Sequence, residues 1–498
     1  MIKIKSILAK PFAKQIATKF YKQSNNAIAL QQKVFKKLIN QAKNTQFGKD
    51  HHFNKIRTYQ DFKKQVPIKD YEALKPYFDK VKKGKENVLW PGKPIYFAKT
   101  SGTTSGAKYI PLTKESMPTH ISAARNALLL YINQTNKSDF VNGKMIFLQG
   151  SPELHDTNGI KTGRLSGIAA HYVPKYLTKN RMPSWETNCI DDWETKVDAI
   201  VEETVNEDMT LISGIPSWVQ MYFEKLIEKT GKKVGEIFPN FNLFVYGGVN
   251  FEPYRNKFED LIGRKVDTVE LYPASEGFMA FQDSQSEKGM MLLVDNGMFY
   301  EFIPSDEFFD ENPTRISLKD VEIGVNYVLI LNTNAGLWGY NIGDTVAFVS
   351  LNPPKIIVTG RIKHFISAFG EHVIGKEVEQ ALNENTINSE IKINEFTVAP
   401  QITPIDELPY HEWFIEFENE PKNMSEFAKN IDKSLQHQNS YYLDLIEGNI
   451  LQPLKITPIL KGGFNNYMKS IGKLGGQNKV PRLSNDRKIA NELLKFKA

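Results

Sequence analysis

The sequence predicts an α/β protein with a large N-terminal domain, in which β-sheets are flanked by helices, and a smaller α+β C-terminal domain. Short apolar segments alternate with helical ones between residues 114 and 277. Short alternating runs at 290–335 predict an antiparallel β-subdomain within the large domain. Two further strands and a helix follow a glycine-marked segment at 358–373. We therefore expect two domains, 1–360 and 361–498, as a chain of 498 residues allows.

The composition is that of a globular protein and narrows the function. The chain is 41% hydrophobic, and its 63 basic and 57 acidic residues leave a net charge of +6. This mild excess suits phosphate-bearing ligands and does not argue for nucleic acid. The single cysteine, Cys189, excludes an intrachain disulfide and fits a reducing cytosol. No apolar run approaches the roughly 18 residues of a membrane span, so we expect a cytoplasmic protein.

Residues 1–49 contain many lysines but no acidic residue and no arginine. Transit peptides are also poor in acids, but they favour arginine, so this segment does not match one. Apolar residues recur at helical spacing at Ile7, Phe12, Ile16 and Phe20, and again at Val34, Leu38 and Ile39. We interpret the segment as two helices that pack on the body of the protein. A basic amphipathic helix on a membrane surface is the alternative.

Proline and apolar spacing set the other expected elements. Residues 60–86 are expected to be helical, with Pro67 and Pro76 as boundaries, because proline lacks the N–H that continues a helix. Further helices are expected at 114–134, 193–208 and 424–438. Strands are expected at 144–148, at 243–249, and at 267–272 before a polar turn.

The segment Thr-Ser-Gly-Thr-Thr-Ser-Gly-Ala-Lys, residues 100–108, has the composition of a phosphate-binding loop. Its glycines let backbone N–H groups approach an anion, its hydroxyls add donors, and its lysine adds a positive charge. The Walker A pattern is absent, which argues against a kinase. A solvated turn between two strands is the alternative. The candidate phosphate-binding residues are Thr100, Ser101, Gly102, Thr103, Thr104, Ser105, Gly106 and Lys108.

Several later segments accompany this loop in a fixed order. They are Leu243–Val249, which ends in two glycines, Asp267–Gly277, Gly339–Thr345, Val358–Val373 and Gly475–Arg482. In this order they resemble the adenylate-forming superfamily of acyl-CoA synthetases, peptide-synthetase adenylation domains and luciferases. Within it, the chain is most similar to the plant auxin- and jasmonate-conjugating acyl acid amido synthetases and their bacterial relatives. The resemblance extends from about residue 30 to about residue 487.

The resemblance implies how adenine is held. The backbone of Gly247, Gly248 and Val249 would lie against the ring, because glycine lets a flat base approach the main chain. Tyr272 would stack on the base, and Ser275 belongs to the same signature.

The resemblance also implies contacts to Mg²⁺ and ribose. Glu276 would hold Mg²⁺, whose hard charge prefers oxygen ligands. Asp344 would accept hydrogen bonds from the ribose hydroxyls, and Arg361 would complete the ATP site. Relatives usually carry arginine where this chain has Asn341, which leaves any role for that position open.

The C-terminal domain is expected to act as a mobile lid. Lys363 occupies the hinge position of the superfamily, where backbone angles change. Lys479, in a Lys-Val-Pro-Arg run, matches a lysine that reaches the active site in the plant enzymes. On the expected helix at 114–134, Arg125 is either a surface charge or the partner of the acyl carboxylate, which a guanidinium fork suits.

These expectations describe an ATP- and Mg²⁺-dependent ligase that forms an acyl-adenylate and passes the acyl group to an amine, an amino acid in the plant relatives. Two alternatives stay open. An acyl-CoA synthetase would share the first half-reaction and use a thiol in the second, and a nucleotide-binding protein would perform no chemistry. We expect a monomer whose partners are a small carboxylic acid and an amine.

Overall fold

The computed structural model divides the chain into two compact units. The large unit comprises Met1–Asp191, Thr195–Gly248 and Arg255–Ile362; the small unit comprises Lys363–Ala498 with two short segments, Asp192–Glu194 and Val249–Tyr254. The structure describes residues 4–100, 107–173, 178–248, 251, 255–305, 307–308, 310–362, 365–366, 368–371, 373–387, 389–471, 480 and 482–498. A large N-terminal and a smaller C-terminal α/β unit is the arrangement that the sequence predicts.

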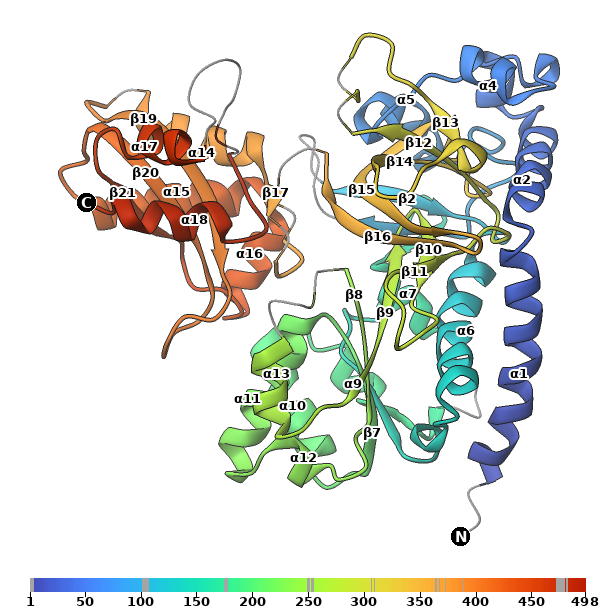
Figure 1. The fold of residues 1–498 in the computed structure, drawn as a ribbon, viewed down its shortest axis with the longest axis horizontal. Coiled ribbons are helices and arrows are strands. Elements are labelled where there is room, and N and C mark those ends of the chain that lie inside the picture. Colours follow the sequence, from blue (N-terminus) through green and yellow to red (C-terminus); the bar gives the residue numbers. More distant parts are fainter. Residues whose placement is uncertain are drawn as a thin grey trace. The chain divides into compact units, whose positions relative to one another are not determined.

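Parallel strands form one half of the main sheet of the large unit. They run across the sheet in the order β6 (Arg181–Met182), β3 (Lys144–Phe147), β7 (Met209–Ser213), β8 (Leu243–Gly247) and β9 (Asp267–Ala274). Figure 1 shows β7, β8 and β9 between two layers of helices. Because both faces are covered, β7 and β8 are buried apolar runs rather than alternating ones.

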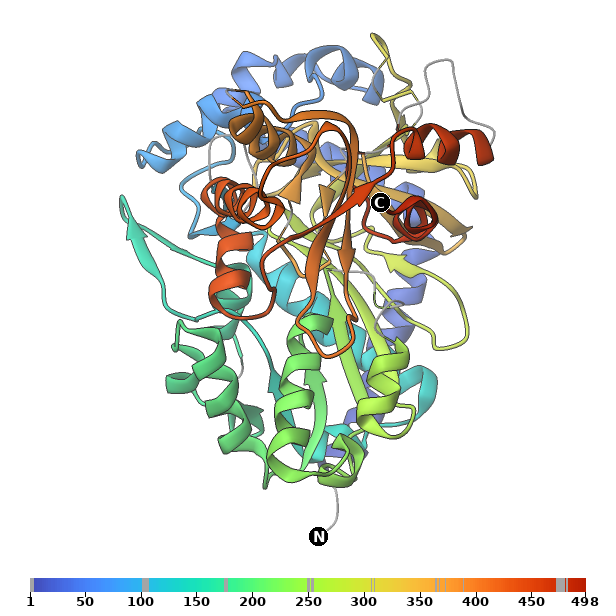
Figure 2. The same cartoon turned by 90° about the vertical axis from the view of Figure 1, so that its left-hand side faces the viewer.

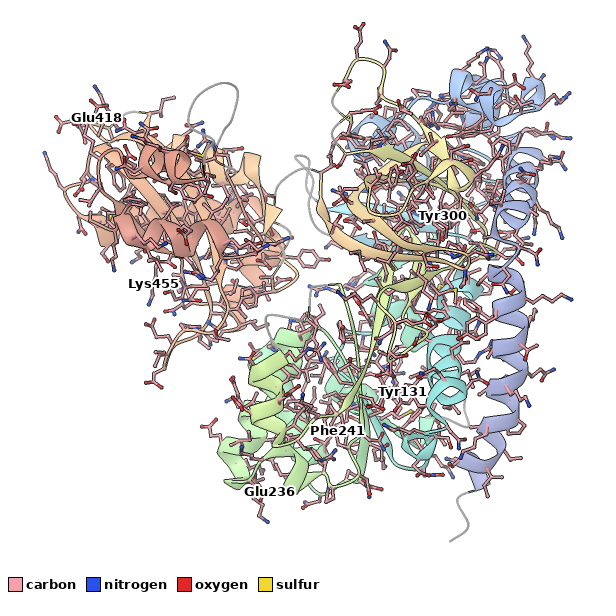
Figure 3. The ribbon with its side chains drawn as sticks, viewed as in Figure 1. Tyr131, Glu236, Phe241, Tyr300, Glu418 and Lys455 are labelled. Atoms are coloured by element: carbon pink, nitrogen blue, oxygen red, sulfur yellow. The ribbon has the colours of Figure 1, made fainter. Side chains whose placement is uncertain are left out.

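The helices on one side are α10 (Trp193–Thr204), α11 (Pro216–Thr230), α12 (Val234–Ile237) and α13 (Arg255–Ile262). The other side carries α1 (Ile4–Ser24) and α6 (Met117–Thr135). Figure 3 shows Tyr131 of α6 within this body, where its Oη donates to Asp267 Oδ2 of β9 at 2.7 Å. The helix expected at 114–134 is therefore confirmed, and it is bonded to the strand it covers.

Helix α1 is held to the body along its length. Ala13 and Ala17 are buried in the same hydrophobic cluster as Ala127 of α6, because these small side chains let the two helices approach closely. Near its start, Ser6 Oγ shares a buried hydrogen bond of 2.6 Å with Ser138 Oγ. The expected N-terminal helices are thus present and packed on the large unit.

The main sheet continues as an antiparallel half. From β9 outward its strands are β10 (Gly277–Phe281), β11 (Met290–Leu292), β16 (Pro354–Arg361), β15 (Tyr340–Leu351), β14 (Asn326–Thr333), β12 (Met298–Pro304) and β13 (Ile316–Ser317). The sheet changes direction where β9 turns into β10, with Ala274 opposite Gly277. The β-subdomain expected at 290–335 lies in this half.

A smaller sheet and the remaining helices complete the large unit. The sheet has the order β2 (Lys108–Leu112), β1 (Tyr96–Thr100), β5 (Ile160–Gly163) and β4 (His155–Thr157). The helices are α2 (Ala27–Ala42), α3 (Gln46–Asp50), η1 (Phe53–Lys55), α4 (Tyr59–Gln65), α5 (Tyr71–Lys82), η2 (Asp139–Asn142), α7 (Leu165–Ala170), α9 (Trp185–Asn188) and η4 (Leu318–Asp320).

The expectation that Pro76 bounds a helix is wrong, because it lies inside α5. Asp70 caps this helix by accepting from Ala73 N, and the face that includes Leu74 and Phe78 is buried. Burial of that face outweighs the one backbone hydrogen bond that a proline removes.

A buried ion pair joins α4 to the antiparallel half. Glu301 of β12 is fully buried and receives two hydrogen bonds from Arg315, at 2.5 and 2.8 Å. Tyr59 Oη and Asn332 Nδ2 donate to the same carboxylate at 2.9 and 2.6 Å. Asn332 Oδ1 in turn accepts from Gly339 N at 2.7 Å. The network therefore fixes the entry into β15.

The small unit is an antiparallel and parallel mixture covered by helices. Its strands are β17 (Phe365–Ile366), β18 (Val373–Ile374), β19 (Lys392–Gln401), β20 (Tyr410–Asn419) and β21 (Lys455–Ile459). Its helices are α14 (Gly375–Thr386), α15 (Met424–Gln438), α16 (Ser440–Glu447), α17 (Gly463–Ser470), α18 (Lys488–Leu493) and η5 (Leu494–Phe496). Phe414 of β20 packs with Phe464 and Leu493. The strands β19, β20 and β21 can be followed in Figure 2.

Within the part of the chain that the structure describes, none of the helices has the length and apolar character needed to cross a bilayer.

We predict that Arg315→Met lowers the free energy of unfolding by roughly 3–5 kcal/mol, because it leaves the Glu301 carboxylate buried without its cation. Urea unfolding measures the loss. The double variant Arg315→Met/Glu301→Leu should recover a large part of it, since both charges are then gone. Arg125→Met, at an exposed arginine, is the matched control and should change stability by less than about 0.5 kcal/mol.

A buried histidine predicts acid sensitivity of the large unit. His120 of α6 is buried, neither ring nitrogen has a hydrogen-bond partner among the residues that the structure describes, and burial lowers its pKa to about 4. The unfolded chain therefore binds a proton more readily, so stability present above pH 6.5 is lost as the pH falls toward 4. The shift corresponds to roughly 3 kcal/mol.

Urea midpoints between pH 7 and pH 4.5 test this prediction. His120→Met should flatten the decline relative to the unaltered protein, whereas His155→Asn, at an exposed histidine, should leave it unchanged. A decline that is equal in all three proteins would contradict the assignment to His120.

Candidate functional site

Two hydrogen bonds between tyrosines and carboxylates gather predicted site residues where β9 turns into β10. Tyr272 Oη donates to Asp344 Oδ2 at 2.6 Å, and both side chains are buried. Tyr340 Oη donates to Glu276 Oε1 at 3.0 Å. Ser275 and Glu276 form the two-residue turn between the paired residues Ala274 and Gly277. The structure thus brings Tyr272, Ser275, Glu276 and Asp344 together from segments about 70 residues apart.

The segment before Asp344 is shaped by Asn341. Its Oδ1 accepts from Gly343 N at 2.8 Å, a local turn that asparagine favours. Gly343 has φ +90°, which a residue with a side chain rarely adopts, and the β14–β15 register shifts here. Asn341 therefore has a structural role, since the turn that it stabilises presents Asp344.

The start of β15 is also fixed from outside the strand. Lys69 N donates to Gly339 O at 2.9 Å, and Asn341 N donates to Lys69 O at 2.8 Å. A side chain at Gly339 would meet Pro67 O at 2.6 Å. The chain before α5 therefore acts as a short partner strand beside the residues that carry Tyr340 and Asp344.

At the end of β8, a neighbouring strand covers the backbone of Gly247, whereas the backbone of the next residue, Gly248, is open. A Cβ on Gly247 would lie 2.5 Å from Leu271 O of β9, so only glycine allows this approach of the strands. Gly248 has φ +85°, and a Cβ there would meet no atom of the described residues within 4 Å. Val249 lies outside the described residues. The backbone at Gly248 is therefore accessible to a flat group, as the adenine assignment requires.

The predicted phosphate loop connects two paired strands. Thr100 and Lys108 are opposite each other at the open end of the β1–β2 hairpin. Residues Ser101, Gly102, Thr103, Thr104, Ser105 and Gly106 lie outside the described residues. Farther along, Thr113 Oγ1 donates to Asn334 O at 2.8 Å, which ties the chain after β2 to the β14–β15 connection. The base of the loop and the strand of Asp344 are thus parts of one bonded body.

Other predicted residues are not placed at this cluster. Arg125 is exposed on α6, and its guanidinium donates to the neighbouring Asn126 Oδ1, so its role toward a carboxylate stays a prediction. Lys363 and Lys479 lie outside the described residues, and so does the side chain of Arg361. The backbone of Arg361 pairs with Asp344, and Ile362 N donates to Gly343 O at 2.8 Å.

Glu276 offers a chemically suitable oxygen for Mg²⁺. Oε1 accepts from Tyr340, whereas Oε2 accepts no hydrogen bond from any residue that the structure describes. Among those residues no group of three His, Cys, Asp or Glu could hold a metal by itself. Mg²⁺ commonly takes one or two carboxylates together with substrate phosphates and waters. The donor set therefore fits a magnesium ion that arrives with a phosphate ligand.

Sequence reasoning missed several residues of this region. Tyr340 lies in the segment Gly339–Thr345 but has no predicted role, and no sequence signal points to Lys69 or Glu301. Lys196 of α10 was also missed; its ammonium is buried and donates to Gln149 O and Asn188 O at 3.1 and 2.6 Å, and burial lowers its pKa to about 8. A lysine on an expected buried face was the available signal for Lys196.

Comparison with known families identifies the lineage. Models of the GH3 family N-terminal, central and C-terminal domains match residues 16–188, 291–361 and 376–488, which is most of the chain. The chain belongs to the GH3 family. The three matched ranges include the predicted phosphate loop, the β-subdomain up to Arg361 and the segment with Lys479.

Curated GH3 relatives resemble the chain along almost its whole length. Jasmonoyl--L-amino acid synthetase JAR6 of Nicotiana attenuata is 19% identical, over 94% of this chain and 93% of that protein. Indole-3-acetic acid-amido synthetase GH3.3 of Arabidopsis thaliana is 20% identical, over 92% of this chain and 90% of that protein.

Solved structures share the fold. AtGH3.15 acyl acid amido synthetase in complex with 2,4-DB matches with a TM-score of 0.62 and 16% identity, over 98% of this chain and 96% of that one. 2-Hydroxyisobutyryl-CoA ligase, with 2-HIB-AMP and CoA in the thioesterification state, matches with a TM-score of 0.58 and 11% identity, over 94% and 91%. The predicted fold, a large N-terminal and a smaller C-terminal α/β domain, is confirmed.

We predict that Tyr272→Phe lowers the free energy of unfolding by about 1.5–3 kcal/mol, because Asp344 loses a donor to a buried carboxylate. Urea unfolding measures it. Tyr109→Phe is the matched control, since that hydroxyl bonds to no described residue, and it should have little effect. Equal stabilities of the two variants would show that the Tyr272–Asp344 bond does not hold the site.

Proposed function

We propose that this chain is an ATP-dependent acyl acid amido synthetase, which activates a carboxylic acid as an acyl-adenylate and transfers the acyl group to an amino acid or another amine. The proposal rests on two hydrogen bonds, one from Tyr272 to Asp344 and one from Tyr340 to Glu276. They bring these carboxylates to the end of β9, and the neighbouring strand β8 leads into the open backbone of Gly248. Membership of the GH3 family supports it.

In the first half-reaction an oxygen of the acyl carboxylate attacks the α-phosphorus of ATP. The bond from that phosphorus to the bridging oxygen breaks, and pyrophosphate leaves. Negative charge grows on the phosphate oxygens, so donors fixed beforehand stabilise this step most. We assign that work to the loop residues 100–106, to Lys108 and to Lys479. Glu276 would hold Mg²⁺, which neutralises charge on the phosphates.

In the second half-reaction the amine nitrogen attacks the acyl carbonyl carbon. The bond from that carbon to the AMP phosphate oxygen breaks, AMP leaves, and the nitrogen loses a proton. Asp344 would hold the ribose through both steps, and Gly247 and Gly248 would hold the adenine. The buried hydrogen bond from Tyr272 would hold the carboxylate of Asp344 in position for that contact.

The amine is preferred over CoA as acceptor because the curated GH3 relatives are named as amido synthetases. The fold is shared with a CoA ligase, so a thioester product is the alternative that the experiment must resolve. Lys363 is proposed as the hinge at which the small unit moves between the two steps.

The proposed function predicts pyrophosphate release that depends on a carboxylic acid. A panel of acids is incubated with ATP and Mg²⁺, and mass spectrometry then identifies amide or thioester products after amino acids or CoA are added. Amide formation supports the proposal, whereas formation of a thioester with CoA and no amide would show that the chain is a CoA ligase instead.

Asp344→Ala should weaken ATP binding at least about tenfold, because the ribose hydroxyls lose a charged acceptor.

The two half-reactions should respond differently to Lys479→Ala. Pyrophosphate release should fall on the order of 100-fold or more, because one fixed donor to the developing charge is lost. Conversion of a supplied acyl-adenylate to amide should persist, since no attack on phosphorus is left in that step. Lys488→Ala, at a nearby exposed lysine, is the control. Equal losses in both steps would contradict a role in adenylation.

A further inference from the structure

The net charge of the chain is concentrated at its N-terminus. Residues 1–49 contain eleven lysines and no acidic residue, so the remaining chain is net −5 when the total is +6. In most chains basic and acidic residues are mixed along the sequence. Lysines gathered at one end therefore point to a negatively charged binding partner. The question is which face of the N-terminal helices presents this charge.

Helix α1 has one packed face and one open face. Ala13 and Ala17 are buried against α6, and each successive residue of a helix turns by about 100°. Leu8 therefore points to the opposite side, and Phe12 and Ile7 lie on the two flanks of this outer face. These three side chains are 64%, 43% and 60% exposed, respectively. Figure 1 shows α1 along the edge of the large unit, with α6 beside it. The outer side of α1 thus carries an exposed apolar patch that consists of these three side chains.

Lysines surround this patch. Lys10 and Lys14 lie along one flank of the patch, and Lys19 and Lys22 continue the same outer face toward the end of α1. All four are exposed, and none forms an ion pair with a residue that the structure describes. Their charges are therefore available to a partner rather than neutralised by the body.

The helix is formed before any partner binds. Ser6 bonds to Ser138 near the start of α1, and near its end Tyr21 Oη donates to Asp283 Oδ2 at 3.3 Å and Gln23 Nε2 to Asp295 Oδ2 at 2.8 Å. A face held in this way loses little conformational entropy on docking. Its apolar side chains and its cations are already aligned along one side.

We propose that the outer face of α1, the patch Ile7, Leu8 and Phe12 with its surrounding lysines, docks on an anionic lipid bilayer. Lysines beside exposed apolar side chains allow a helix at a bilayer surface to insert the apolar side chains at the boundary between headgroups and acyl chains. A nucleic acid would use the lysines but would leave the apolar patch in water. A second copy of the chain would bring like charges together. The lipid surface satisfies both parts of the face.

Vesicle sedimentation tests the proposal with the full chain. Vesicles of phosphatidylcholine alone are compared with vesicles that contain one part phosphatidylserine to two parts phosphatidylcholine. We expect binding to the anionic vesicles only, and weaker binding as salt is added, because each lysine near such a surface raises the partition coefficient about fivefold at low salt. Absence of binding to anionic vesicles, or equal binding to neutral ones, would overturn the proposal.

Two matched pairs of variants separate the patch from general effects of charge. Leu8→Glu/Phe12→Glu should lower the partition coefficient at least about tenfold. Ile323→Glu/Ile405→Glu replaces two apolar side chains that are 60% and 87% exposed elsewhere, and should lower it far less. Equal losses in the two double variants would overturn the assignment to α1.

A second pair tests the lysines. Lys10→Gln/Lys14→Gln should weaken binding on the order of tenfold, whereas Lys422→Gln/Lys488→Gln, at side chains 95% and 89% exposed, should have a small effect. Light scattering and DNA competition test the other partners. A dimer that dissociates in the variant Leu8→Glu/Phe12→Glu would overturn the proposal. Duplex DNA that binds as tightly as anionic vesicles, with an affinity unchanged by that variant, would overturn it as well.

Discussion

The buried carboxylate of Glu301 is the point on which the antiparallel half of the large unit depends. It receives hydrogen bonds from Arg315, Tyr59 and Asn332, three residues from different segments. A charge fully removed from water requires such partners, so these segments are held at fixed spacing. Asn332 passes the constraint to Gly339 N, and two residues later Asn341 sets the turn before Asp344. A structural ion pair thereby positions a carboxylate of the candidate site.

The candidate site lies where the main sheet changes from parallel to antiparallel. Ligands of open α/β sheets bind at the carboxyl ends of parallel strands, where neighbouring connections diverge. Here β8 ends in Gly247 and Gly248, and β9 ends in the turn that carries Glu276. The antiparallel strand β15 then brings Asp344 to Tyr272. Each half of the sheet thus supplies residues to the candidate site.

Local sequence patterns predicted the elements better than the contacts between them. Apolar spacing identified α6, α15 and the glycine-ended strand β8, because periodicity reflects which face of a segment is buried. Family resemblance placed Tyr272, Glu276 and Asp344 in one site. Neither approach could find that Tyr340 holds Glu276 or that Lys69 pairs with β15, since such pairings depend on strand register across distant segments. The prediction that Pro76 bounds a helix was wrong for a related reason, because burial of one face of α5 outweighed the local preference of proline for helix ends.

The positive charge of the chain is distributed unevenly, because it is concentrated on and around helix α1. Residues 1–24 contain six lysines and no acid, which equals the entire net charge of +6, so the rest of the chain is neutral overall. Five of these lysines lie on α1, along one edge of the large unit, and this uneven distribution of charge gives that unit an electric dipole. Near any negatively charged surface the dipole experiences a torque as well as an attraction, so the molecule turns before it makes contact. The lysines of α1 therefore set the orientation of approach, and the apolar side chains act only after that orientation is reached.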